Sequence, residues 1–137
     1  MGKLFVLVAD DEVLVAETLV EILRDEGFAA ESVRDGVAAV EFVRKRKPDI
    51  VICDVVMPNL NGIEAAKQIR EIAPETHILL FSGQAATMDL LEEAQTKGFN
   101  FEILAKPMKP ETLLAAIGRL VEADAAGGRN KGIVSKN

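Results

Sequence analysis

Five short apolar runs alternate along the chain with longer segments in which apolar and polar residues recur at helical spacing. Short apolar runs bounded by turn residues are typical of buried parallel strands. The run at Phe28–Val33 is the most polar, so we expect it at an edge of the sheet, whereas Asp49–Cys53 reads as central and fully buried. The predicted strands are Leu4–Ala9, Phe28–Val33, Asp49–Cys53, His77–Phe81 and Phe101–Ala105.

The intervening segments predict helices that begin and end at recognisable residues. Asp35 and Asn61 are expected to cap the second and third helices, because their side chains accept hydrogen bonds from free backbone N–H groups. Gly27 is expected to follow the first helix in a left-handed conformation. The predicted helices are Glu12–Glu26, a segment from Asp35 that ends before Pro48, Gly62–Ile72, a segment after Ser82-Gly83-Gln84 that runs to about Lys97, and Pro110–Val121.

Strands that alternate with helices of this length predict an α/β fold. Each βαβ crossover brings the next strand back parallel to the last, so the helices cover both faces of a doubly wound, five-stranded parallel sheet. The length of 137 residues and the hydrophobic fraction of 49% suit one core. We therefore expect one folded domain over residues 1–123 and a disordered tail over 124–137, where Gly127-Gly128 and polar residues predominate.

Composition narrows the functional classes. The formal net charge of −6 argues against direct binding of nucleic acid, which needs a basic surface. No run approaches the roughly 18 apolar residues that span a membrane, and the N-terminus lacks a secretory signal. We expect a cytoplasmic protein that does not bind a membrane.

Polar residues with chemical potential follow four of the predicted strands: Asp10 and Asp11, Asp54, Ser82 and Lys106. Ligands of open parallel sheets bind at the carboxyl ends of the strands, so these side chains are expected at one edge. Three carboxylates at one place repel one another unless a cation lies among them. Mg²⁺, which is bound by one or two carboxylates together with phosphate oxygens, fits this pattern.

The same five residues can serve phosphoryl transfer. Asp54, kept ionised beside a cation, could attack phosphorus and form an aspartyl phosphate, while Lys106 and Ser82 hold phosphoryl oxygens. Structural roles remain open for each residue alone. Asp10 or Asp11 could cap the first helix, Asp54 could be a turn carboxylate, Ser82 could cap the next helix, and Lys106 could be solvated.

Taken together, these motifs resemble a response-regulator receiver domain of bacterial two-component signalling, of the stand-alone chemotaxis type. The resemblance covers roughly residues 3–122. The matching stretches are Val8-Ala9-Asp10-Asp11-Glu12, Cys53-Asp54-Val55-Val56-Met57-Pro58 with Asn61-Gly62, Phe81-Ser82-Gly83, and Ala105-Lys106-Pro107.

The resemblance implies a flavodoxin-like (βα)5 fold with strand order 2-1-3-4-5. It implies that Asp54 accepts a phosphoryl group from a histidine kinase or a phosphotransfer protein. Asp10, Asp11, Asp54 and the main-chain carbonyl of Val56 would bind magnesium, and Lys106 and Ser82 would contact the phosphoryl group.

The resemblance also implies how such a protein signals. Phosphorylation would change the surface made by the helix after Ser82, the strand Phe101–Ala105 and the helix Pro110–Val121. The downstream protein is unknown, and the chain would be a monomer or a weak phosphorylation-dependent dimer. The protein would catalyse only its own phosphorylation and dephosphorylation, and the peptide bond Lys106-Pro107 would be cis.

Some positions depart from the family pattern. Ile103 stands where a Tyr or Phe commonly acts as a rotamer switch, and Ser82 replaces the commoner threonine. Val56, two residues after the acceptor, cannot orient an attacking water, so we expect a persistent phosphoryl group. No output domain follows, which suggests a stand-alone or an excised receiver.

Three other functions are compatible with parts of the pattern. An aspartate-nucleophile phosphatase of the haloacid-dehalogenase type usually needs a second aspartate at the position of Val56. A flavin or nucleotide binder needs a phosphate-cradling loop in place of Asp10-Asp11-Glu12. A degenerate receiver that is never phosphorylated is the third.

Overall fold

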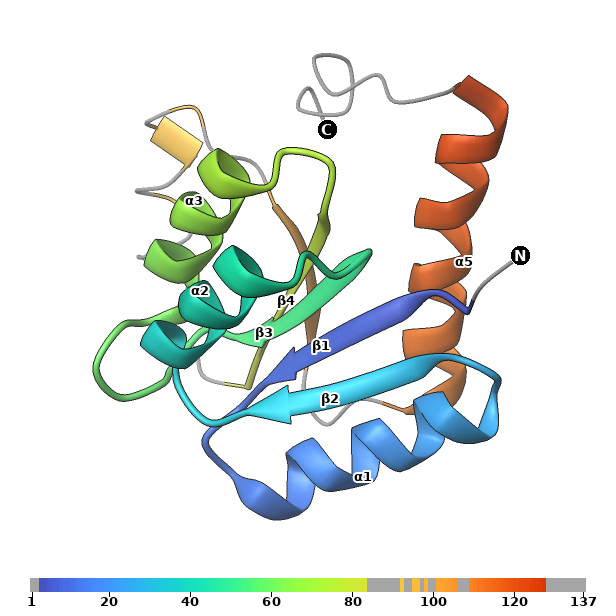
Figure 1. Cartoon of the computed structure of the whole chain (residues 1–137), viewed down its shortest axis with the longest axis horizontal. Helices are drawn as coiled ribbons and strands as arrows, with labels where there is room; N and C mark the ends of the chain where they lie inside the picture. Colours follow the sequence, from blue (N-terminus) through green and yellow to red (C-terminus); the bar gives the residue numbers. More distant parts are fainter. Residues whose placement is uncertain are drawn as a thin grey trace.

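Five parallel strands form one sheet in the order β2-β1-β3-β4-β5 (Figure 1). The computed structural model describes residues 3–83, 92, 95, 96, 98, 101–105 and 109–127. The strands are β1 (Phe5–Ala9), β2 (Ala29–Val33), β3 (Ile50–Asp54), β4 (His77–Ser82) and β5 (Glu102–Ala105). This order and the flavodoxin-like fold are those that the family resemblance implied, and the polar strand β2 lies at the predicted edge.

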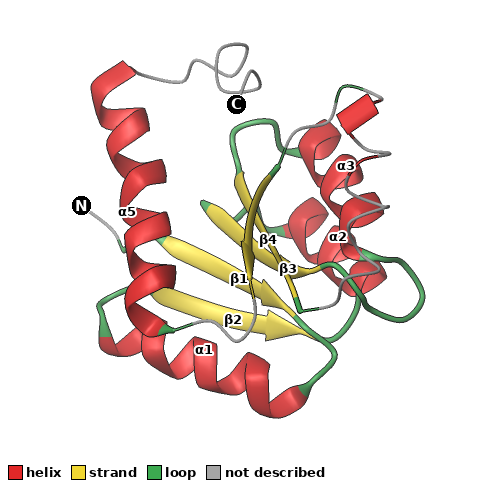
Figure 2. Ribbon diagram, turned by 180° about the vertical axis from the view of Figure 1, so that it is seen from behind, coloured by secondary structure: helices red, strands yellow, loops and turns green. Residues whose placement is uncertain are grey.

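Helices cover both faces of the sheet, as Figure 2 shows from behind. They are α1 (Val13–Asp25), α2 (Gly36–Lys45), α3 (Gly62–Ile72) and α5 (Pro110–Gly127). Residues of α2 and α3 pack into one buried cluster that includes Leu7, Val51 and Leu80. Residues of α1 and α5 pack into another cluster on the opposite face, with Val8 and Ile52. Alternate residues of the central strands thus serve opposite layers of the core.

The end of α1 shows how a single glycine directs the chain into β2. Gly27 has φ of 100°, a left-handed conformation that glycine adopts without steric cost. The Gly27 N–H donates to the carbonyl of Arg24, and the Phe28 N–H donates to the carbonyl of Leu23. This pair of hydrogen bonds is a Schellman motif, and it confirms the predicted helix end.

Several boundaries differ from the sequence predictions. Helix α5 continues beyond Val121 to Gly127, so residues 124–127, expected in a disordered tail, are helical. Ala123, Ala125 and Ala126 account for this extension, since alanine has the highest helix propensity. The helix predicted after Ser82 falls almost entirely outside the described residues, as do residues 128–137.

The outer edge of β2 is covered by a side chain of α1. Ala29 donates its N–H to the carbonyl of Leu4 and so faces β1 with its backbone groups. Successive residues of a strand alternate in this respect, so the carbonyl of Ala30 points away from β1. Arg24 reaches over this edge and donates from Nε at 3.2 Å and from Nη2 at 2.8 Å to the Ala30 oxygen. A free edge carbonyl invites another strand, so Arg24 protects the sheet against edge-to-edge pairing.

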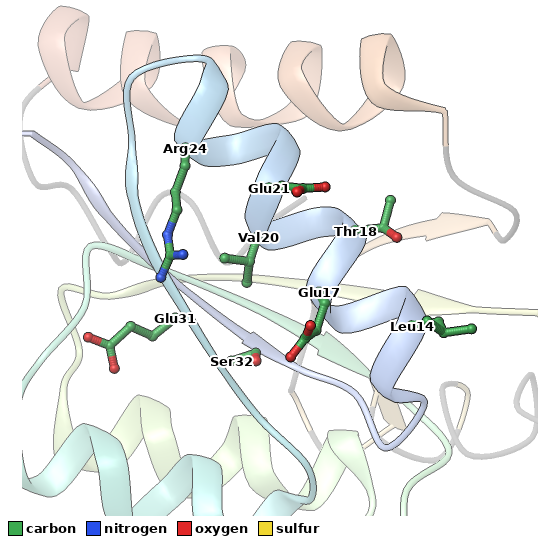
Figure 3. A pocket seen from close by; sticks show the side chains of 8 residues that line it. All are labelled: Leu14, Glu17, Thr18, Val20, Glu21, Arg24, Glu31 and Ser32. Carbon is green, nitrogen blue, oxygen red and sulfur yellow. The ribbon is translucent and has the colours of Figure 1, made fainter.

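The guanidinium of Arg24 also lines an open groove between α1 and β2 (Figure 3). The groove has a volume of about 610 Å³ and carries glutamates beside the arginine. Its lining residues are Leu14, Glu17, Thr18, Val20, Glu21, Arg24, Glu31 and Ser32.

Among the helices that the structure describes, none is both long enough and apolar enough to cross a membrane.

We predict that Arg24→Met destabilises the fold and exposes the edge of β2. The variant keeps much of the aliphatic stem but loses both hydrogen bonds to Ala30, so the free energy of unfolding should fall by about 1 kcal/mol. Urea unfolding measures the stability, and sedimentation velocity should show more self-association than in wild type. Arg44→Met, at an exposed position of α2, is the control, and equal effects of the two substitutions would contradict this role for Arg24.

Candidate functional site

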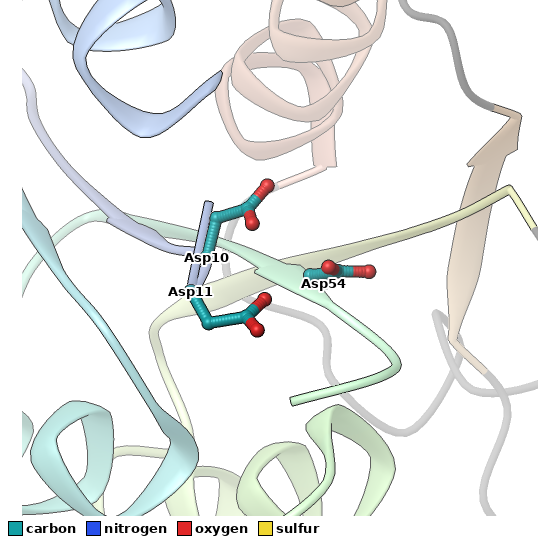
Figure 4. Close-up of side chains that lie close together, drawn as sticks. All are labelled: Asp10, Asp11 and Asp54. Atoms are coloured by element: carbon teal, nitrogen blue, oxygen red, sulfur yellow. The ribbon is translucent and has the colours of Figure 1, made fainter. Parts of the chain in front are cut away.

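Three aspartates gather at the carboxyl edge of the sheet (Figure 4). Asp10 and Asp11 follow β1, and Asp54 is the last residue of β3, the neighbour of β1. Each contributes a carboxylate oxygen to a cluster in which all these atoms lie within 4.8 Å of one another. Asp10 and Asp54 are buried, whereas Asp11 is exposed. The predicted meeting of the three carboxylates is therefore confirmed.

Asp10 is held by backbone groups on both sides of its strand end. Its N–H donates to the carbonyl of Val33 at 3.1 Å, and its Oδ1 accepts from the N–H of Glu12 at 2.9 Å. The N-cap residue of α1 is Glu12, and its own side chain makes no capping hydrogen bond. The alternative in which Asp10 or Asp11 is the N-cap residue of α1 is therefore wrong, because α1 begins at Val13, one residue too late for Asp11 and two for Asp10.

Asp54 is fixed by the backbone around it. The next residue, Val55, donates its N–H to the carbonyl of Phe81 and accepts from the N–H of Gly62 at 2.8 Å. Asp54 Oδ1 accepts a long hydrogen bond of 3.4 Å from the N–H of Val56. The loop after β3 therefore closes tightly over the strand end before α3 begins.

Gly62 allows this closure. A Cβ atom built at Gly62 would lie 2.1 Å from the carbonyl oxygen of Asp54, a distance that no side chain tolerates. Asn61, immediately before it, accepts from the N–H of Glu64 at 2.9 Å and caps α3 as predicted. The sequence Asn61-Gly62 thus combines a helix cap with a close backbone approach to the candidate nucleophile.

Cys53 reports the electrostatic character of the same region. Its thiol is fully buried, and its pKa is raised, first by burial and then by the negative charges of Asp54 and Asp10. A raised thiol pKa means that further negative charge is disfavoured here. The part of this shift that comes from Asp54 and Asp10 is electrostatic, and the same negative charges attract a nearby cation.

The geometry of the cluster fits a small divalent cation. Oxygen ligands on opposite sides of an octahedral Mg²⁺ are roughly 4 Å apart, and neighbouring ligands are closer. Separations within 4.8 Å therefore need only small side-chain adjustments. Because Asp11 is exposed, water and a phosphoryl oxygen can reach the cluster. Mg²⁺ usually has both kinds of oxygen among its ligands.

The other predicted site residues lie around this edge to the extent that they are described. Ser82 is the half-buried last residue of β4, and its register partner on β5 is Ala105. Val56 follows Asp54 by two residues, and 43% of its surface is exposed. Lys106, and with it the predicted cis bond to Pro107, lies outside the described residues.

The position of the expected aromatic switch is occupied by a partly exposed aliphatic residue. Ile103 pairs with Leu80 in the sheet, and 37% of its surface is exposed. Phe101, the described aromatic residue nearest to Ile103 in sequence, lies just before β5, where the Arg70 guanidinium stacks over its ring at 4.5 Å from the centroid. Burial of Arg70 lowers the pKa of its guanidinium. This contact ties α3 to the start of β5.

Sequence reasoning missed a contact between Asp35 and Asn59. Asp35 was expected only to cap α2, and it does accept from the N–H of Ala38 at 2.8 Å. Its second oxygen accepts from Asn59 Nδ2 at 2.9 Å. Asn59 has φ of 71°, and asparagine after Pro58 is a recognisable signal for such a left-handed turn residue.

Comparison with known proteins gives a consistent result. Residues 6–118 match the family described as the response regulator receiver domain. The transcriptional regulatory protein PdtaR of Mycobacterium tuberculosis is 41% identical over 115 residues, covering 82% of this chain and 54% of that protein. The transcriptional regulatory protein CreB of Escherichia coli is 30% identical over 121 residues, which cover 88% of this chain and 52% of that protein. The chain thus spans about half the length of these curated relatives.

A solved structure agrees in fold over nearly its full length. The chemotaxis protein CheY4 of Vibrio cholerae is 30% identical and superposes with a TM-score of 0.76, covering 86% of this chain and 98% of that one. A CheY-like receiver domain protein of Methanospirillum hungatei has a TM-score of 0.81 at 20% identity, which supports the fold alone.

We predict that Gly62→Ala and Gly118→Ala have opposite effects on stability. The added methyl group collides with the Asp54 carbonyl in the first variant, whereas nothing lies within 4 Å of it at Gly118 in α5. Gly62→Ala should cost about 2 kcal/mol or more of unfolding free energy through strain, and Gly118→Ala should add about 0.5–1 kcal/mol through helix propensity. Chemical denaturation measures both values, and a neutral Gly62→Ala would refute the close approach.

Proposed function

The chain belongs to the response regulator receiver domain family, and we propose that it is a phosphoacceptor that takes a phosphoryl group onto Asp54 in the presence of Mg²⁺. The observation that carries this proposal is the cluster of Asp10, Asp11 and Asp54, whose carboxylate oxygens lie within 4.8 Å of one another. Such a cluster is costly unless a cation is bound, and it leaves one carboxylate beside the cation as a nucleophile.

Asp10, Asp11, Asp54 and the main-chain carbonyl of Val56 are the proposed metal ligands. When bound, Mg²⁺ neutralises negative charge on the phosphoryl oxygens and so permits two anions to approach. Asp54 attacks the phosphorus of a phosphohistidine, the P–N bond breaks, and the electron pair returns to the imidazole. Ser82 is proposed to donate a hydrogen bond to a phosphoryl oxygen, and Lys106 to pair with the phosphoryl charge.

The proposed donor is a histidine kinase or a phosphotransfer protein, and the proposed location is the cytoplasm. The signal would pass to an unknown downstream protein through the surface that comprises β5, α5 and the segment after Ser82. Glu102 of β5 and Arg119 of α5 already form an ion pair across that surface. A monomer or a weak phosphorylation-dependent dimer is the proposed assembly state.

The proposed role excludes turnover of a separate substrate. A haloacid-dehalogenase-type phosphatase would need an acid and base two residues after the nucleophile, and Val56 supplies neither. A flavin or nucleotide binder would bring phosphate against Asp10 and Asp11 without a compensating loop. These observations favour the receiver function over both enzymatic and nucleotide-binding alternatives.

We predict that the chain gains the mass of one phosphoryl group when it is incubated with acetyl phosphate and Mg²⁺. Asp54→Asn should abolish the gain because the amide is a poor nucleophile. Intact-protein mass spectrometry measures the product, and chelation of Mg²⁺ should suppress it. Asp49→Asn, which changes the exposed carboxylate before β3, is the matched control and should retain phosphorylation. No mass gain with this donor or with a phosphorylated kinase would favour the degenerate receiver.

We also predict that the phosphoryl group is long-lived and that Val56→Asn shortens its lifetime. An amide at this exposed position can orient an attacking water, which the valine cannot, so the rate of loss should rise roughly tenfold. The decay of phosphorylated protein after removal of the donor gives the rate. Val37→Asn, at a similarly exposed valine of α2, should leave it unchanged. Faster loss from wild type than from Val56→Asn would contradict the assignment.

A further inference from the structure

Asp35 connects the start of α2 with the loop that follows the acceptor strand. One carboxylate oxygen accepts from the N–H of Ala38 at 2.8 Å and caps α2. The other accepts from Asn59 Nδ2 at 2.9 Å, across 24 positions of sequence. A helix cap needs only one of these oxygens, so the second hydrogen bond serves the loop.

The backbones of the same two segments also touch. A Cβ atom built at Gly36 would lie 2.1 Å from the carbonyl oxygen of Leu60, so glycine is required for this approach. Leu60 in turn donates its N–H to the carbonyl of Pro58 at 2.7 Å, which tightens the turn at Asn59. We refer to the hydrogen bond between Asp35 and Asn59 and the contact between Gly36 and Leu60 as the α2 anchor.

The α2 anchor holds the middle of the loop between β3 and α3, which carries the proposed metal ligand, the carbonyl of Val56. Backbone hydrogen bonds fix the loop at Val55 and at Gly62, and between them the chain must hold the carbonyl of Val56 in position. Val56 is 43% exposed, so its own side chain adds little packing, although its neighbours Val55 and Met57 are both buried. Fixing Asn59 and Leu60 shortens the free segment and lowers the entropy that must be lost when a ligand orders it.

We propose that the α2 anchor positions the Val56 carbonyl for Mg²⁺ and thereby raises the affinity of the aspartate cluster for the ion. This inference rests on the proposed function and extends it to Asp35 and Asn59, which act as positioning residues and do not touch the ion. Because coupling is reciprocal, Mg²⁺ also stabilises the anchor and the first turn of α2.

Two substitutions remove the hydrogen bond with little other damage. Asn59→Gly removes the donor, and glycine retains the left-handed conformation at φ of 71°. Asp35→Ser retains a side-chain oxygen that can cap α2, but it has no second oxygen for Asn59. Each variant should bind Mg²⁺ about 3- to 10-fold more weakly, the effect expected of one hydrogen bond. The double variant should be no weaker than either single one, because both remove the same contact.

The measurement is isothermal titration of the full chain with Mg²⁺, without any phosphoryl donor. Thr76→Val is the matched control, since it also removes a single hydrogen bond, the one of 2.7 Å that Thr76 Oγ1 donates to the carbonyl of Pro48. Thr76 lies just before β4, at the opposite end of that strand from Ser82. It should leave the affinity for Mg²⁺ unchanged. Amide hydrogen exchange gives a second readout, because Mg²⁺ should slow exchange at Ala38 in wild type and fail to do so in Asn59→Gly.

The outcomes separate the two proposals. Wild-type affinity for Mg²⁺ in both folded anchor variants, or an equal loss in Thr76→Val, overturns the anchor and leaves the phosphoacceptor function standing. A wild-type chain that binds no Mg²⁺ overturns the proposed metal site itself. Additive losses in the double variant would show that Asp35 and Asn59 act separately, which also overturns the anchor.

Discussion

The repulsion among three carboxylates at one edge of the sheet is the constraint on which the site depends. At the separation found here, within 4.8 Å, two ionised carboxylates repel by at least about 3 kcal/mol at an effective dielectric constant of roughly 20. The strands and loops hold Asp10 and Asp54 together in spite of this cost, and both are buried. The folding free energy that holds the carboxylates together is therefore also the source of the affinity for a cation, because a bound cation relieves their repulsion.

The fold could be predicted because each step follows from local chemistry. Short apolar runs bounded by turn residues favour buried strands, and the helices between them favour parallel pairing through their crossovers. The strand order 2-1-3-4-5 was expected from the family resemblance alone. Since parallel strands end at the same edge, the residues after them must meet, as Asp10 and Asp54 do. The caps at Asp35 and Asn61 were predictable for the same reason, because each acts within three residues.

The features that sequence reasoning missed depend on contacts between distant segments. Neither the pairing of Asp35 with Asn59 nor the approach of Gly36 to Leu60 has a local signature, because each requires the final placement of α2 beside the loop after β3. The start of α1 at Val13 rather than Glu12 was also unpredictable, since Asp10 uses its carboxylate in a turn. The position of Lys106 stays a prediction, so the cationic half of the proposed site rests on the sequence.

Cys53 gives the protein an internal probe of its own acceptor strand. It is the single thiol of the chain, lies fully buried next to Asp54, and belongs to the core cluster between the sheet and helices α2 and α3. A thiol reagent can reach it only when this part of the core opens, so the labelling rate reports how often that opening occurs. The chain thus carries a native probe of the core beside its acceptor strand, which needs neither a mutation nor an attached fluorophore.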